Sequence, residues 1–152
     1  MNQAENTAIL SMGSLVIAVP QTDIVSVDVA ADAKPGLSEN LLTAASLHKQ
    51  GEQWPVYAFS DELKPQSQLS NTCRFFACIQ KDNMQYALAC DAIELVKINN
   101  ETPQQALPYI MQANNSPITC LLSINNKVTL QANAESLNHY LESLGANNAE
   151  SK

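Results

Sequence analysis

The sequence is poor in the residues from which most catalytic and nucleic-acid-binding sites are built. In 152 residues it has two histidines, four glycines, seven lysines and a single arginine, Arg74, and its net charge is -7. A protein that binds a phosphate backbone needs clustered Lys and Arg, so we expect no nucleic-acid partner. The glycines are far apart, which excludes a Gly-rich phosphate-binding or dinucleotide-binding loop.

Long hydrophobic runs are also absent. The most apolar early stretch, Ala8 to Val19, has 12 residues, too few to span a bilayer. A secretory signal begins with positive charge, yet the first basic residue is Lys34 and Glu5 precedes the apolar stretch. We therefore expect a cytoplasmic protein that does not insert into a membrane.

The cysteines lack the paired spacing of a structural zinc site. Free cysteines in strands usually behave as small buried hydrophobic residues, so we expect reduced thiols, no metal and no cofactor. A Cys-His pair with His48 or His139 stays open as a second hypothesis, because such pairs form in space rather than in sequence. The four cysteines are Cys73, Cys78, Cys90 and Cys120.

The remaining composition favours a mainly β protein. Hydrophobic residues make up 45% of the chain, and asparagine, with 15 residues, takes the place of glycine in turns. Asp82-Asn83 and Asn125-Asn126 each separate two apolar runs and predict two hairpins with type I′ turns. Eight short strands are predicted, over residues 15–19, 24–29, 54–59, 75–79, 84–88, 93–98, 118–122 and 128–130.

Helices are few in this pattern. Asn133 can cap a C-terminal helix with an apolar stripe from Leu137 to Leu144, and Gly145 is expected to end it. A weaker helix is predicted from Ser38, with Ala45 on its apolar face, and a single turn near residues 102–105. We expect one domain over residues 14–144, a flexible N-terminal segment over 1–13 and a flexible polar tail over 145–152.

Several modest motifs, in order, resemble the CheW-like coupling domain of bacterial chemosensory systems. Leu15 to Pro20 with Ile24 to Val27 is similar to its opening strand pair, and Gly51 to Phe59 to its "G-x-x-x-P-V-x-D-L" segment. Tyr86 to Val96 is similar to its "G-L-L-V-D-x-V-x-E-V" strand, which is the best match. Leu107-Pro108, Ile118 to Leu122 and Ala134 to Leu141 fit its last hairpin and terminal helix.

The resemblance implies two small SH3-like five-stranded β-subdomains around a shared core. It also implies a non-enzymatic adaptor that couples the regulatory domain of a CheA-type histidine kinase to chemoreceptors, or to a related motility pathway, through protein surfaces. Exposed strand edges and apolar grooves between the subdomains would make these contacts. The alternative, from the four thiols and His48, is a small cysteine-dependent enzyme or redox sensor.

The departures from the family concentrate in the segment where the family has "N-L-R-G" and this chain has His48 to Gly51. Gln50 replaces the arginine, and glutamine cannot supply a charged bidentate fork unless Lys49 substitutes for it. Ser26 stands where the second strand of the family has an acidic residue. Asp91 matches a family position but can equally cap a turn. Trp54 is either an interface anchor or a core residue. The predicted partner-binding residues are Lys49, Gln50, Gly51, Glu52 and Trp54.

Overall fold

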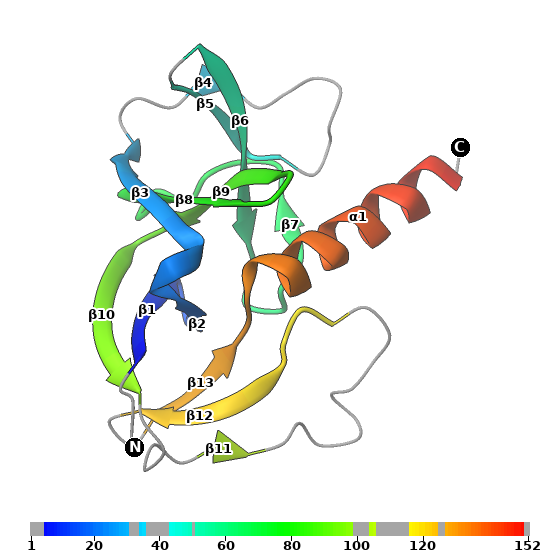
Figure 1. The fold of residues 1–152 in the computed structure, drawn as a ribbon. Coiled ribbons are helices and arrows are strands. Elements are labelled where there is room, and N and C mark those ends of the chain that lie inside the picture. The colour runs from blue at the N-terminus through cyan, green and yellow to red at the C-terminus, as the bar shows by residue number, and fades with distance from the viewer. Residues whose placement is uncertain are drawn as a thin grey trace.

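A computed structural model describes residues 5–30, 34–35, 43–49, 51–98, 104–105, 116–124 and 127–150. In this part of the chain strands predominate and one long helix closes the C-terminal end (Figure 1). No helix in it has the length and apolar character needed to cross a membrane. The elements are β1 (Glu5–Met12), β2 (Leu15–Pro20), η1 (Gln21–Asp23), β3 (Ile24–Val29), β4 (Lys34–Pro35), β5 (Ala45–Lys49), β6 (Glu52–Phe59), β7 (Pro65–Gln66), β8 (Phe75–Lys81), β9 (Met84–Cys90), β10 (Ala92–Ile98), β11 (Gln104–Gln105), β12 (Cys120–Ile124), β13 (Lys127–Gln131) and α1 (Ala134–Glu150).

The strands form two sheets, as the predicted fold class requires. One sheet has the order β10-β1-β2-β13-β12-β11, and the other has the order β3-β8-β9-β6-β5-β4 with β7 beside β6. Without the two-residue strands β4, β7 and β11, each sheet has five strands. The mainly β class with two five-stranded units and a C-terminal helix is confirmed.

The N-terminal segment differs from the prediction, because residues 5–12 are not a flexible lead but the strand β1. This strand lies between β10 and β2, so side chains on both of its faces are buried, including Ala8, Ile9 and Leu10. A doubly buried strand shows a continuous apolar run instead of alternation. Gly13, with φ +64°, makes the two-residue turn into β2.

Both predicted hairpins form. Lys81 pairs with Met84 across the β8–β9 turn, and Ile124 pairs with Lys127 across residues 125–126, which lie outside the described residues. In the first turn only Asp82 has a positive φ, 54°. A type I′ turn needs positive φ at both central residues, so that predicted turn type is wrong.

Two predicted helical segments are strands in the residues that the structure describes. Ala45, placed on the apolar face of a helix from Ser38, instead begins strand β5 and pairs with Val56. Residues 36–42, where that helix would begin, lie outside the described residues. Near residues 102–105 the described pair, Gln104–Gln105, is the short strand β11 rather than a helical turn. Local apolar spacing was overridden in β5 by sheet pairing, which buries Ala45 and Leu47.

Helix α1 begins where the sequence predicts. Asn133 Oδ1 accepts a hydrogen bond from the backbone N–H of Ser136 at 2.7 Å, which confirms the N-cap. The helix continues past Gly145 to Glu150, so the predicted helix end at Gly145 is wrong. One glycine inside a helix costs only about 1 kcal/mol, and no proline follows to stop the helix.

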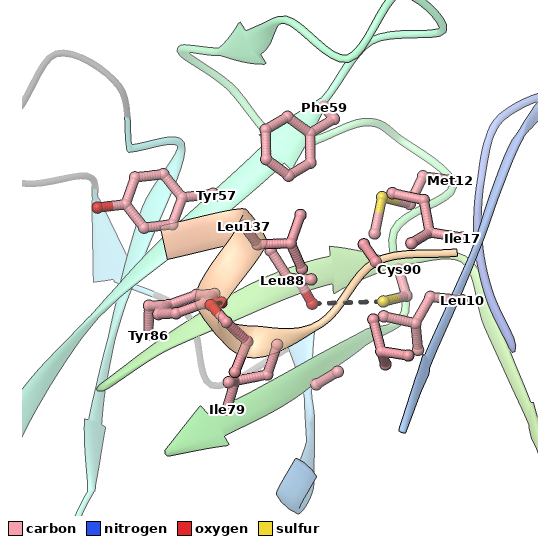
Figure 2. Packing of buried hydrophobic residues seen from close by; sticks show 14 of the residues in the cluster. Leu10, Met12, Ile17, Tyr57, Phe59, Ile79, Tyr86, Leu88, Cys90 and Leu137 are labelled. Atoms are coloured by element: carbon pink, nitrogen blue, oxygen red, sulfur yellow. Dashed lines mark hydrogen bonds between the residues drawn. The ribbon is translucent and has the colours of Figure 1, made fainter. Parts of the chain in front are cut away.

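The main core lies between the two sheets and is covered by α1. Leu137 of the helix is fully buried and points among side chains of both sheets, with Leu10 and Ile17 from one and Tyr86 and Leu88 from the other (Figure 2). The two sheets therefore share one hydrophobic core. A second cluster, around Trp54 and Phe76, lies on the other face of the seven-stranded sheet.

Candidate functional site

The predicted partner-binding residues lie on the β5–β6 hairpin. Lys49 ends β5 and pairs with Glu52 of β6, while Gly51 has φ +77° in the turn between them. A Cβ built on Gly51 would meet nothing within 4 Å, so glycine is favoured there by its backbone conformation and not by crowding. Gly51 and Glu52 are exposed, and Gln50 lies outside the described residues.

Trp54 supports this hairpin from within the protein. Its side chain is 3% exposed and belongs to the second core cluster with Leu47, Val56 and Phe76. The Nζ of Lys49 lies 5.6 Å from the centroid of the indole ring, within cation-π range. Of the two roles that the sequence left open, the structure gives Trp54 that of a core residue, and its indole presents almost no surface to a partner.

The ammonium group of Lys49 forms an ion pair with a carboxylate of the same chain. Its Nζ donates a hydrogen bond to Asp28 Oδ2 at 3.0 Å and another to Ser26 Oγ. The thiol of Cys78 donates to the same carboxylate oxygen at 3.1 Å. Asp28 was missed in the sequence, although it lies two residues after Ser26 and therefore on the same face of β3. Lys49 thus forms its carboxylate contact within this chain.

These contacts shift the pKa values of the Asp28 carboxyl and the Cys78 thiol. Burial raises the pKa of the Asp28 carboxyl, but hydrogen bonds from Cys78, Lys49 and Ser26 and the charge of Lys49 outweigh it, so the pKa is lowered overall. Burial, and the hydrogen bond to Asp28, raise the pKa of the Cys78 thiol to about 11. At neutral pH the carboxylate is therefore charged and the thiol is protonated.

Asp28→Asn is expected to lower the free energy of unfolding by about 1–2 kcal/mol at pH 7, because it removes a charge-assisted contact from a partly buried lysine. A carboxyl whose pKa is lowered by folding stabilises the protein above its unfolded pKa of about 4 and stops doing so as pH falls through the folded value. The difference between wild type and Asp28→Asn should therefore shrink between pH 5 and pH 2, measured by urea unfolding. Glu94→Gln, which alters an exposed carboxylate on β10, is the control, and an equal loss in both variants would contradict this role of Asp28.

A second exposed feature lies along β3. Its odd-numbered side chains, Val25, Val27 and Val29, are 52%, 49% and 56% exposed, and Leu95 of β10 is 58% exposed. Val25, Val27 and Leu95 line a cleft of about 450 Å³ between β3 and β10, two edge strands of different sheets, on the same side of the molecule (Figure 1). The sequence predicted strand 24–29 but not which of its faces would be exposed, because only the packing of the sheets decides that.

Asp91 accepts two hydrogen bonds that hold a turn. Its Oδ2 accepts the backbone N–H of Gly13 at 2.8 Å, and its Oδ1 accepts the hydroxyl of Thr72 at 2.9 Å. A nearby carboxylate, Asp61, accepts the N–H of Ser14 at 3.3 Å. Both carboxylates line a cleft of about 260 Å³, and both hold the β1–β2 turn.

The four thiols give little support to cysteine chemistry. Burial raises the pKa of each thiol above its ordinary value, and most strongly for Cys90. Because the thiolate is the nucleophile, raised pKa values reduce reactivity at neutral pH. The thiols donate hydrogen bonds to backbone carbonyls, a carboxylate and an amide oxygen, and His48 and His139 are both exposed.

Comparisons with known proteins bear on the fold of this chain. No family model matches the chain, and no curated protein sequence is significantly similar to it. Among solved structures it is similar to the crystal structure of scaffolding protein TtCheW from Thermoanaerobacter tengcongensis, with a TM-score of 0.62 over 86% of this chain and 89% of that chain. The two sequences are 12% identical, so the likeness shows a shared fold.

Proposed function

We propose that this chain is a non-enzymatic adaptor of bacterial chemosensory signal transduction, acting in the cytoplasm. It would couple the regulatory domain of a CheA-type histidine kinase to chemoreceptors, or to a related motility pathway, through protein-protein contacts. The observation that carries the proposal is the likeness to a scaffolding protein over most of both chains. The ordered sequence motifs and the raised pKa values of the thiols support it.

Two described surfaces suit protein partners. The β5–β6 hairpin presents Gly51 and Glu52 on a turn supported by Trp54 and by the Lys49–Asp28 ion pair. The cleft between β3 and β10 presents exposed apolar side chains, and apolar patches with polar surroundings are typical of interaction sites. An adaptor that joins two proteins needs two separate contact surfaces, and these two lie on different elements.

The test is calorimetry of the full chain against each CheA-type regulatory domain and each receptor tip encoded in the same genome. Glu52→Lys should weaken one class of partner, and Leu95→Asp should weaken the other, each by about tenfold or more if the side chain is a binding hot spot. The same changes at exposed positions of other elements, Glu142→Lys on α1 and Val128→Asp on β13, serve as controls.

Silence against every regulatory domain and receptor tip would overturn the proposal. An equal loss of binding in the control variants would contradict the assignment of the partner contacts to these two surfaces. Circular dichroism of each variant separates loss of binding from loss of folding.

A further inference from the structure

Strand β3 forms an edge of the seven-stranded sheet. On one side it pairs with β8 from Ile24 to Val29, and among the described residues no strand pairs with its other side. A register shift between Ile24 and Ser26 leaves Ser26 to Val29 as the regular part of the ladder. An unpaired strand presents free backbone donors and acceptors to any strand that can align with it.

The hydrogen-bonding phase of this edge can be read from one bond. The N–H of Ala30 donates to the carbonyl of Arg74 at 3.0 Å, while the N–H of Arg74 donates to Cys90. Ala30 and Arg74 therefore form one of the two bonds of a hydrogen-bonded pair, in the register that pairs Val29 with Phe75. Such pairs alternate along the strand, so Asp28 and Ser26 also direct their backbone groups to β8. Val27 and Val29 therefore direct their N–H and C=O groups to the free edge.

The side chains of this edge do not protect it. Proteins usually guard an exposed edge with lysine, proline, inward-pointing charges or β-bulges. Strand β3 contains neither lysine nor proline, and its bulge lies at its start, before Ser26. Its one charge, Asp28, is paired with Lys49. The other face carries the exposed side chains of Val25, Val27 and Val29.

We infer that β3 pairs with β3 of a second copy of this chain, antiparallel and across a two-fold axis at Val27. In this register Val27 of one copy forms a hydrogen-bonded pair with Val27 of the other, and Val25 lies opposite Val29. The phase of the edge permits this pairing because odd-numbered residues meet odd-numbered residues. Three cross-strand valine pairs then form one apolar strip on a single face of the joined sheets.

Charge distinguishes this register from its neighbours. An axis at Asp28 would place two like carboxylates directly opposite each other, which is destabilising. An axis at Ser26 would bring the register shift between Ile24 and Ser26 next to the centre of the interface, whereas an axis at Val27 leaves only Val25, at its end, beside that shift. With the axis at Val27, Asp28 of one copy lies opposite Ser26 of the other. Each carboxylate then lies opposite a hydroxyl and keeps its ion pair with Lys49 of its own copy.

This pairing does not depend on the proposed coupling function. It does bear on it, because Val25 and Val27 line the cleft between β3 and β10. Self-association at this edge and binding of a partner in the cleft would then compete for the same side chains. The dimer would keep the apolar edge covered when no partner is present.

Sedimentation equilibrium of the full chain over a concentration series tests the inference. Wild type should show a reversible monomer-dimer equilibrium, and Val27→Lys should weaken it by about tenfold or more, since the two new charges meet at the axis. Val128→Lys makes the same change at a more exposed valine, 68% exposed, on β13, and should leave the equilibrium unchanged.

Cysteine cross-linking tests the register with side chains that do not alter charge. In a background where the partly exposed Cys73 and Cys120 are replaced by serine, Val27→Cys should form a disulfide-linked dimer under mild oxidation. Val25→Cys should not, because it lies four residues, or about 13 Å, from its own counterpart. A wild-type protein that stays monomeric at every concentration, or cross-linking of Val25→Cys as readily as Val27→Cys, would overturn the inference.

Discussion

Trp54→Ala is expected to lower the free energy of unfolding by about 3–5 kcal/mol, the range found for removing a large aromatic from a packed core. Trp54 is 3% exposed and packs in the cluster that contains Phe76 and Val56, both fully buried. The change would leave a cavity under the β5–β6 hairpin and remove the ring beneath Lys49. Urea unfolding that shows a shifted midpoint with an unchanged slope would measure this loss.

The matched control keeps the aromatic packing. Trp54→Phe should recover more than half of the lost stability, because it preserves most of the buried apolar area. If Trp54→Ala instead left the unfolding midpoint unchanged and abolished only partner binding, Trp54 would be an interface anchor and the packing described above would be wrong. A loss of both stability and binding indicates that Trp54 acts on the hairpin by supporting it.

Asp23→Ala is expected to cost about 2–3 kcal/mol, because it leaves a buried backbone donor without an acceptor. Asp23 is 4% exposed, and its Oδ2 accepts the N–H of Ala134, the first residue of α1, at 3.0 Å. The two residues are 111 positions apart in the chain. This contact ties the short η1 segment, which connects the two sheets, to the start of the helix.

The size of the loss should separate this distant cap from the local one. Asn133→Ala removes the side-chain acceptor for Ser136 and should cost about 1 kcal/mol. Asp23→Asn keeps a side-chain oxygen and should recover part of the stability. Thermal and urea unfolding of the three variants measure the order, and an Asp23→Ala variant as stable as wild type would show that water satisfies the helix start equally well.

Local chemistry sufficed for the elements that alternate or carry a clear turn. The β8–β9 hairpin, the β12–β13 hairpin and the cap at Asn133 each depend on residues close together in sequence, so their predictions hold. Strand β1 was missed because both of its faces are buried, which removes the period-two pattern. Strand β5 was misread as part of a helix because alanine has a high intrinsic helix propensity, and pairing with β6 overrides that preference at Ala45.

At the candidate site, too, the sequence predicted what depends on neighbouring residues and missed what depends on contacts between distant strands. The sequence pointed to the residues from Lys49 to Trp54 and to Gln50 in place of the family's arginine, and it noted that Ser26 stands where that family has an acidic residue. It did not identify a carboxylate near Lys49. The carboxylate that holds Lys49 is Asp28, 21 residues away in sequence. Sequence spacing offers no measure of that distance in space. The ion pair is visible only in the fold, where β3 and β5 come together although three strands separate them in the order of their sheet.

The sequence by itself determined that the protein is mainly β, that a capped helix follows Asn133, and that no nucleic-acid or phosphate-loop chemistry is built in. These conclusions depend on composition, turn residues and periodicity, all of which act over a few residues. The tertiary structure alone decided that Trp54 is buried, that Asp23 caps a helix 111 residues away, and that three valines of the edge strand β3 are exposed. Such outcomes depend on which strand lies beside which, because burial and pairing are properties of neighbours in space.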